Sequence, residues 1–135
     1  MPLRPDATLD KFVNRGVGRL PGLIGVRFTA VAENRIDAEL DIRPELLAPN
    51  GYLHAATVIA LADTACGYGC LAHLPTGAEN FTTVELKSNF LGTAVHLGNA
   101  TQVWDAMVTD RVRGRKVALF RCTQLILWPE SARRA

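Results

Sequence analysis

The chain has 135 residues, of which 48% are hydrophobic and 21% charged, and its formal net charge is +2. This length suits one globular domain, because it can bury roughly two thirds of the unfolded surface but cannot support two independent cores. The small net charge argues against a general affinity for nucleic acid. The N-terminus is charged, and no uninterrupted apolar stretch reaches about 20 residues, so we expect neither a signal peptide nor a membrane span. The sequence therefore predicts a single cytoplasmic domain over residues 1–135, with no nucleic-acid or membrane partner.

The first part of the chain is predicted to be helical over residues 1–22. Thr8 suits the N-cap of a short helix that ends near Gly16 or Gly18. Pro21-Gly22 is then expected to break the chain. At the other end, residues 129–135 are expected to form a frayed tail.

Two β-like runs follow, over residues 25–33 and 35–43, joined at Glu33-Asn34. In the second run apolar residues alternate with acidic ones, which is the pattern of a half-exposed strand. The next segment, from Pro44 to Gly51, is predicted to be a loop that ends in the turn-forming sequence Pro49-Asn50-Gly51. The alternating apolar residues are Ile36, Ala38, Leu40 and Ile42.

A long apolar stretch, residues 55–74, forms the centre of the sequence. It contains no Lys or Arg and is rich in Ala and Leu, and about 20 residues are too many for a strand, so it predicts one helix that ends near His73-Leu74. The helix is apolar nearly all round, so we expect other elements to wrap it. Gly67 and Gly69 weaken a helix, and their presence predicts a close approach to a sheet.

Asp63 is the one formally charged residue in this stretch. An unpaired buried carboxylate costs several kcal/mol or takes up a proton. Two interpretations stay open: Asp63 pairs with a structural partner, or it is placed there for chemistry.

The three cysteines indicate a reducing compartment. Cys66 and Cys70 lie on one face of the predicted helix, and Cys122 lies in an apolar run. No CxxC or paired-His motif accompanies them, so we expect buried thiols and no metal site.

Three strand-like runs complete the chain, over residues 81–91, 99–110 and 116–128. The resulting order is two strands, one long helix and three strands. Strands that follow one another without intervening helices favour an α+β fold, with an antiparallel sheet curled round a single helix.

The central stretch also resembles a known family. Gly51, His54, Ala55 and Ala56 are followed by Asp63 nine residues after the histidine, which is similar to the pattern G-x-x-H-G-G with a later Asp or Glu. The segments 82–87 and 89–91 resemble the next strand of that family. The family is that of the hotdog-fold acyl-CoA thioesterases of the phenylacetate-degradation (PaaI-like) type, related to the 4-hydroxybenzoyl-CoA thioesterases, and the likeness extends from about residue 35 to 127.

This resemblance implies an activity and roles for particular residues. Members hydrolyse an acyl-CoA thioester whose carbonyl oxygen lies at the N-terminus of the central helix, where backbone amides stabilise the developing charge. Here these donors would be the amides of Ala55 and Ala56, at positions where the family usually has Gly. Asp63 would act as general base or as nucleophile, and Thr83 would orient the attacking water. No cofactor is implied, because CoA is part of the substrate.

The loop before the helix departs from the family pattern. Ala48 stands where related enzymes carry Asn or Gln. Asn50 either replaces that amide or forms the turn before Gly51. His54 either contacts the substrate or anchors the loop and helix start.

The spacing along the helix has a further implication. Ala55 and Asp63 are separated by about 12 Å at 1.5 Å rise per residue, which is too far for both to act on one carbonyl carbon. Each site would then combine residues of two antiparallel helices across a two-fold axis. This agrees with the homodimer, and the tetrameric dimer of dimers, that the resemblance implies.

CoA phosphates require positive charge. The basic turn between the last two strands is a candidate binding site, although a solvated hairpin tip explains it equally well. The candidate substrate contacts are Ala56, Thr82, Lys87, Arg113, Arg115 and Lys116.

Alternatives from other classes stay open. A hotdog hydratase or dehydratase would pair the acid with a catalytic His, and a non-enzymatic acyl-CoA or aromatic-ligand binding protein would tolerate Ala48. The acyl group is expected to be aryl, short or medium in length. Tyr68, Phe81 and Phe90 either line its pocket or belong to the core.

Overall fold

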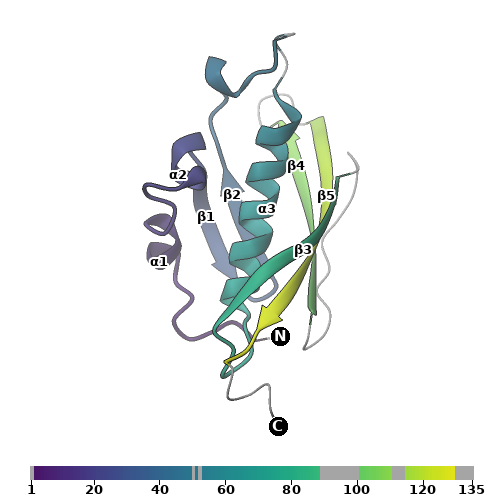
Figure 1. Ribbon diagram of the computed structural model, residues 1–135. Coiled ribbons are helices and arrows are strands. Elements are labelled where there is room, and N and C mark those ends of the chain that lie inside the picture. The colour runs from purple at the N-terminus through teal and green to yellow at the C-terminus, as the bar shows by residue number, and fades with distance from the viewer. Residues whose placement is uncertain (1, 50, 52, 89–100, 111–114, 130–135) are drawn as a thin grey trace.

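The computed structural model describes residues 2–49, 51, 53–88, 101–110 and 115–129. One long helix lies in front of a curved set of strands, and two short helices flank it on the N-terminal side (Figure 1). In chain order the elements are α1 (Leu9–Val13), α2 (Leu20–Ile24), β1 (Arg27–Ala32), β2 (Arg35–Glu39), the 3-10 turn η1 (Pro44–Leu46), α3 (Ala55–Ala72), β3 (Asn80–Ser88), β4 (Thr101–Asp110) and β5 (Arg115–Leu127).

All the strand pairs are antiparallel. β1 pairs with β2, and β5 lies between β3 and β4 in a second group of three strands. α3 packs against strands of both groups. The predicted α+β architecture, an antiparallel sheet wrapped round one central helix, is therefore confirmed.

The core has two parts, one on each side of α3. The first joins α3 to β5 and to the segment after the helix, and the second joins α3 to α1, β1 and β2. The three cysteines are buried thiols, as predicted. The buried residues of the first part are Ala62, Cys66, Cys70, Leu74, Ala78, Phe120, Cys122 and Ile126.

Helix α3 begins and ends close to the predicted residues. His54 is its N-cap and His73 its C-cap. A Cβ atom added at Gly67 would lie 2.9 Å from the ring of Phe81 on β3. The expected close approach to the sheet is thus confirmed at Gly67, where only a hydrogen fits between the helix backbone and the aromatic ring.

His73 fastens the C-terminal end of α3 to the β1–β2 hairpin. Its buried ring makes two hydrogen bonds: Nδ1 donates to the Gly69 carbonyl oxygen at 2.8 Å, and Nε2 accepts from the Asn34 N–H at 2.9 Å. Asn34 has a φ of 58° in the turn between the two strands. Burial lowers the pKa of His73, so the ring is neutral at neutral pH.

The N-terminal segment differs from the prediction. The helix that follows Thr8 is only five residues long, and the Thr8 side chain makes no capping bond. The expected break at Pro21-Gly22 is wrong, because Pro21 lies in the first turn of α2, where a missing N–H is tolerated. Gly22 allows this second helix to pack closely on the loop, since a Cβ there would lie 2.5 Å from the Gly16 carbonyl oxygen.

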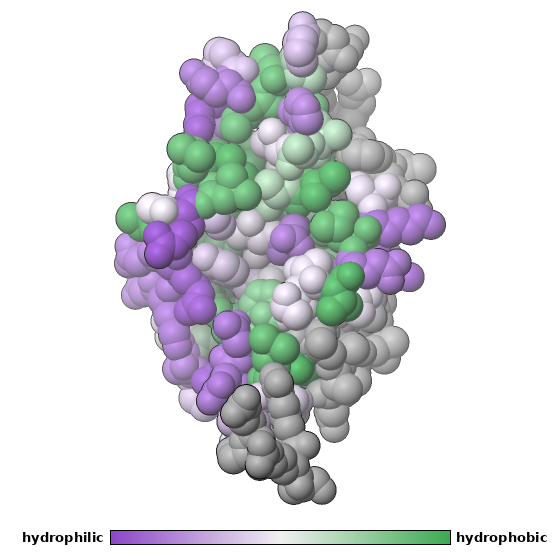
Figure 2. All heavy atoms as spheres, viewed as in Figure 1, coloured by the Kyte–Doolittle hydropathy of each residue, from purple (hydrophilic) through white to green (hydrophobic). Residues whose placement is uncertain are grey.

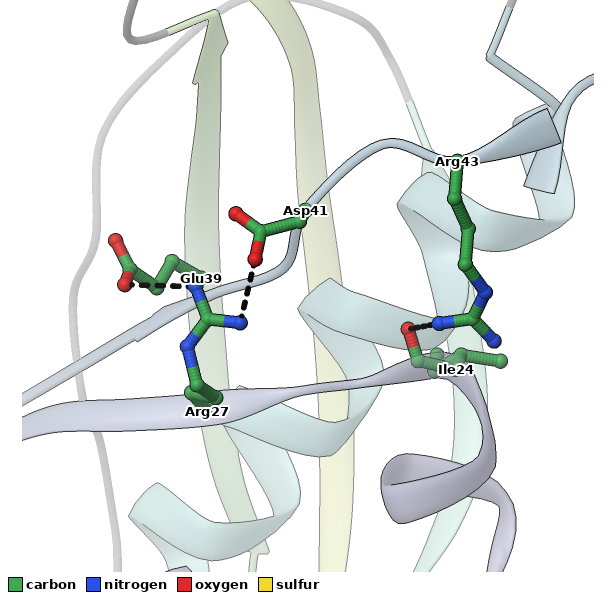
Figure 3. Close-up of polar contacts among 5 residues, drawn as sticks. All are labelled: Ile24, Arg27, Glu39, Asp41 and Arg43. Atoms are coloured by element: carbon green, nitrogen blue, oxygen red, sulfur yellow. Dashed lines mark hydrogen bonds and ion pairs between the residues drawn. The ribbon is translucent and has the colours of Figure 1, made fainter.

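The second strand is shorter than its alternating pattern predicted. β2 ends at Glu39, although the alternation continues to Ile42. The guanidinium of Arg27 on β1 binds Glu39 at 3.2 Å and Asp41 at 2.8 Å, so it holds the chain where the strand ends (Figure 3). Beyond this point the chain diverges from β1.

Arg43 accounts for the direction that the chain takes after β2. Its guanidinium donates to the carbonyl oxygens of Leu23 at 2.6 Å and Ile24 at 3.4 Å, at the C-terminal end of α2. Figure 3 draws the contact with Ile24. The side chain thereby satisfies two terminal helix carbonyls. The loop that leads to α3 is thus tied to α2.

The surface is apolar on the side from which α3 is seen. In Figure 2 apolar atoms extend from the region of α2 across the exposed side of α3 towards β3, whereas hydrophilic atoms gather over α1. Among the described residues, α3 alone is long and apolar enough to cross a membrane, but strands of both groups pack against it, as they do against the core helix of a globular domain. The exposed large apolar residues in this region include Leu20, Leu23, Ile42, Val84 and Leu86.

Candidate active site

Asp63 has a partner on the sheet. It lies near the middle of α3, is half-buried, and its Oδ1 accepts a hydrogen bond from Thr83 Oγ1 of β3 at 3.3 Å. The carboxylate that is isolated in the sequence is therefore held from outside the helix. Because it keeps some solvent exposure, it can meet a substrate or a water molecule.

The two threonines of β3 face opposite ways. Thr83 is half-buried and bonded to Asp63, whereas Thr82 is exposed. The strand is irregular directly after this pair, since its register with β5 shifts between Thr83 and Glu85. Such bulges re-aim side chains and are frequent near functional sites. Of the two threonines, only Thr83 lies at the Asp63 carboxylate.

A second polar side chain contacts Asp63. Cys122 Sγ on β5 lies 3.7 Å from Asp63 Oδ1. Burial, and then the negative charge of Asp63, raise the pKa of the Cys122 thiol to about 12, so it stays protonated. The sequence predicts only a buried thiol at Cys122. Its alternation with Phe120, which is also buried, was the available signal that it faces α3.

The N-terminus of α3 offers one open backbone donor. His54 Nδ1 accepts a hydrogen bond from the Ala56 N–H at 3.0 Å, and the His54 carbonyl oxygen accepts from Thr57 and Val58. No described residue accepts a hydrogen bond from the Ala55 N–H, and Ala55 is exposed. Of the two amides predicted to bind the thioester oxygen, that of Ala55 is available and that of Ala56 is bonded to the capping imidazole.

The loop before α3 is fixed by its own hydrogen bonds. The Leu46 carbonyl oxygen accepts from the His54 N–H at 3.0 Å and from Thr57 Oγ1 at 3.2 Å. The Gly51 N–H donates to the Ala48 carbonyl oxygen at 2.8 Å, and Gly51 has a φ of 83°. Asn50, predicted either to replace the missing amide or to form the turn, lies outside the described residues.

Of the basic residues predicted to bind CoA, only Lys87 has a described side chain. Lys87 is exposed near the end of β3, paired in register with Arg121. The backbones of Arg115 and Lys116 begin β5, paired with Asp110 and Thr109. Arg111 and Arg113 lie outside the described residues.

The aromatic candidates for an acyl pocket belong to the core. Tyr68 stacks on Phe28 with ring centroids 4.6 Å apart and contacts Phe12 at 5.5 Å. Phe81 packs against Gly67 and the first part of the core. Phe90 lies outside the described residues.

Known proteins share sequence similarity with this chain. The sequence model of the Thioesterase superfamily matches residues 50–95, a range that includes Asp63 and Thr83. A 1,4-dihydroxy-2-naphthoyl-CoA hydrolase of Listeria monocytogenes is 26% identical over 111 residues, 74% of this chain and 89% of the relative. A protein of the same name from Escherichia coli is 25% identical over 134 residues, 89% of this chain and 95% of the relative.

Solved structures share the fold over nearly the whole chain. A mutant thioesterase of Pseudomonas aeruginosa has a TM-score of 0.84 at 22% identity and covers 94% of this chain and 99% of its own. A thioesterase family protein of Silicibacter pomeroyi has a TM-score of 0.72 at 25% identity, with 89% and 95% covered. The PaaI protein of the Escherichia coli phenylacetic acid degradation operon has a TM-score of 0.69 at 19% identity, with 79% and 83% covered. Residues 50–95 are therefore similar to the Thioesterase superfamily, and the chain shares the hotdog fold of the solved thioesterases, with an acidic residue on the central helix.

Proposed function

We propose that the protein hydrolyses an acyl-CoA thioester to the free acid and CoA. One observation carries the proposal: Asp63, half-buried on an otherwise uncharged helix, is bonded to the Thr83 hydroxyl and keeps access to solvent. A carboxylate held in this way suits a base or nucleophile, because its orientation is fixed while its other oxygen has no donor among the described residues. The names of the relatives, hydrolases of a CoA thioester, support the same activity.

The reaction needs two groups at the acyl carbon. In the general-base form, Asp63 removes a proton from water, the water oxygen bonds to the carbonyl carbon, and the C–S bond breaks as CoA thiolate leaves and is protonated. In the nucleophile form, an Asp63 oxygen displaces CoA, and water then hydrolyses the mixed anhydride. In both forms the carbonyl oxygen becomes negative and is stabilised by the open Ala55 amide at the helix N-terminus.

These two groups come from different protomers in our proposal. Ala55 and Asp63 lie on one unbroken helix, about 12 Å apart along its axis. Two antiparallel copies of α3 across a two-fold axis would bring Asp63 of one protomer to the Ala55 amide of the other. The apolar surface around α3 supports such a partner (Figure 2), since exposed apolar patches of this kind commonly mark interfaces.

The acyl group is proposed to be aromatic. Both named relatives act on an aryl thioester, 1,4-dihydroxy-2-naphthoyl-CoA. Short-chain and medium-chain acyl-CoAs are the alternative substrates. The kcat/KM values for aryl, short-chain and medium-chain acyl-CoAs decide which class the enzyme prefers.

The activity is tested by release of CoA from aryl, short-chain and medium-chain acyl-CoAs, with Asp63→Asn beside the wild type. We expect at least about a hundredfold loss of kcat in Asp63→Asn, because the amide can neither take a proton from water nor attack the thioester. Asp10→Asn makes the same chemical change at an exposed position on α1 and is expected to be fully active. Full turnover by Asp63→Asn would reject the mechanism, and binding of CoA without turnover by the wild type would indicate a binding protein.

The described histidines give no support to a hydratase or dehydratase. Both ring nitrogens of His73 are hydrogen bonded in the core, at the opposite end of α3 from the open amide. His54 uses Nδ1 to cap the helix. His96 lies outside the described residues.

A further inference from the structure

Two donors from adjacent strands converge on the same oxygen of Asp63. Thr83 Oγ1 lies 3.3 Å and Cys122 Sγ 3.7 Å from Oδ1, and no described donor contacts Oδ2. We propose that Cys122 is a positioning residue, whose thiol donates a hydrogen bond to Asp63 Oδ1 and, together with Thr83, turns Oδ2 towards the reacting water or acyl carbon. The inference rests on the proposed hydrolysis.

Cys122 has a proton to donate. Its side chain is completely buried, and burial together with the Asp63 charge raises its pKa to about 12. A thiol in this state is inert as a nucleophile, because the thiolate is the reactive form. The same proton allows it to act as a weak hydrogen-bond donor to the carboxylate.

The sheet geometry places Cys122 and Thr83 on one face. Phe120, Cys122 and Ile126 alternate along β5 and are all buried against α3. Thr83 pairs in register with Gln124, two residues from Cys122, so Thr83 and Cys122 belong to the same face of neighbouring strands. Neither contact depends on a flexible loop, since β3, β5 and α3 are all regular elements.

A thiol suits this position for a chemical reason. A hydrogen bond to a carboxylate favours its charged form and so weakens it as a base, and a strong donor does so more than a weak one. A second hydroxyl beside Thr83 would therefore orient Asp63 but reduce its basicity. The S–H group is a weaker donor, so it orients the carboxylate and lowers its basicity less.

The test compares Cys122→Ala, Cys122→Ser and Cys70→Ala. Cys70 is an equally buried thiol of the same core with no described contact to Asp63, so its variant controls for lost packing. In Cys122→Ala we expect kcat to fall about three- to fivefold at unchanged KM, and the acidic limb of the pH–rate profile to move to higher pH, because the charged carboxylate has lost a donor. Cys122→Ser should restore kcat and bring the limb to the wild-type position or below it.

Cys70→Ala is expected to keep the wild-type kcat and pH profile. If Cys122 has a purely structural role, both alanine variants should lose the same stability. The acidic limb of the pH–rate profile should then stay at the wild-type position in both. Where Cys122→Ala does not fold, Cys122→Val, which is apolar and close in volume, replaces it. Identical kcat and pH profiles in the Cys122 and Cys70 variants would overturn the proposal.

A titration of the Asp63 carboxyl carbon by 13C NMR separates this inference from the proposed function. We expect its midpoint in Cys122→Ala to exceed that in Cys70→Ala, whether or not the substrate tried is hydrolysed. If Asp63→Asn is fully active, the proposed mechanism fails whatever the titration shows, and Cys122 has no catalytic role. If Asp63 is essential but the midpoints of the two variants coincide, only the assignment of Cys122 fails.

Discussion

Thr82 and Thr83 are chemically identical neighbours in opposite surroundings. One side chain is exposed, while the other donates to the Asp63 carboxylate and is partly shielded from water. A hydrogen bond to a charged group in such a place contributes about 1.5 to 3 kcal/mol. The two positions therefore form a matched pair for measuring the importance of this contact.

We predict that Thr83→Val lowers kcat at least about tenfold, because the loss of a charge-assisted hydrogen bond leaves Asp63 less well oriented. Thr82→Val is expected to stay within about twofold of the wild type, since its side chain does not reach the carboxylate. Steady-state hydrolysis of one acyl-CoA by the two variants, with circular dichroism to confirm folding, makes the comparison. Equal activity of the two variants would show that Thr83 only fills the strand.

At the scale of elements, the contact between α3 and β3 depends on the pair Gly67 and Phe81. A methyl group at residue 67 would lie within 2.9 Å of the Phe81 ring. Such overlap costs typically 1 to 3 kcal/mol and outweighs the gain of about 1 kcal/mol from replacing Gly by Ala in a helix.

We predict that Gly67→Ala lowers the free energy of unfolding by about 1 kcal/mol in urea denaturation. Phe81→Leu loses packing by itself, but it makes room for the added methyl. The double variant Gly67→Ala/Phe81→Leu is therefore expected to be more stable than the sum of the single effects. Additive effects would mean that the ring is not the obstacle at residue 67.

The join between α3 and the β1–β2 hairpin predicts a pH dependence. Burial keeps the pKa of His73 in the folded state below its ordinary value of 6.5. Above that value neither state binds the proton, so the full stability is present. As the pH falls, the unfolded chain takes up the proton first, and stability is lost between pH 6.5 and the lower pKa of the folded state.

We predict that the loss of melting temperature between pH 7.5 and pH 5.5 is smaller in His73→Gln than in the wild type. Differential scanning calorimetry at the two pH values gives the comparison. An unchanged loss in His73→Gln would assign the acid sensitivity to other groups.

Much of this arrangement follows from the sequence. The length and composition of residues 55–72 predict α3, and the lone Asp63 marks the candidate catalytic position. The N-terminal helices were misjudged because Pro21 and Gly22 usually break a chain, whereas here the first turn of a helix accepts Pro. The end of β2 depends on Arg27 and Arg43, whose partners lie on other elements and leave no periodic signal.

The candidate site, too, could be predicted only in part, because some of its contacts join residues far apart in the sequence. The identity of Asp63 and the alternation of Thr82 and Thr83 are local properties of the sequence. The contact of Cys122 with Asp63 joins residues 59 positions apart. It follows only from the register of β5 against β3 and α3, which local patterns do not determine.

At the scale of the whole molecule, the proposed site requires two protomers. We predict a dimer or a dimer of dimers in size-exclusion chromatography with light scattering. A monomer that turns over acyl-CoA would contradict the composite site.

Subunit mixing gives a more specific prediction. Ala55→Pro removes the open amide at a helix position that favours proline, and Asp63→Asn removes the carboxylate. Each variant alone should be inactive. Random reassociation makes half of the dimers mixed, each with one intact site of two, so about a quarter of the wild-type activity should return. Ala55→Gly keeps the amide and serves as the active control, and no recovery on mixing would place both groups in one chain.

Helix α3 has one open end and one closed end. Ala55 and Ala56 are exposed at its start, whereas Cys70, Ala72 and His73 are buried at its finish. Amide hydrogens should therefore exchange with deuterium on a gradient along this single helix, through small local openings in the first turn and only through global unfolding in the last. The amide proposed to bind the thioester oxygen then lies in the least protected turn of α3, so that this turn can yield to a substrate while the rest of the helix remains closed.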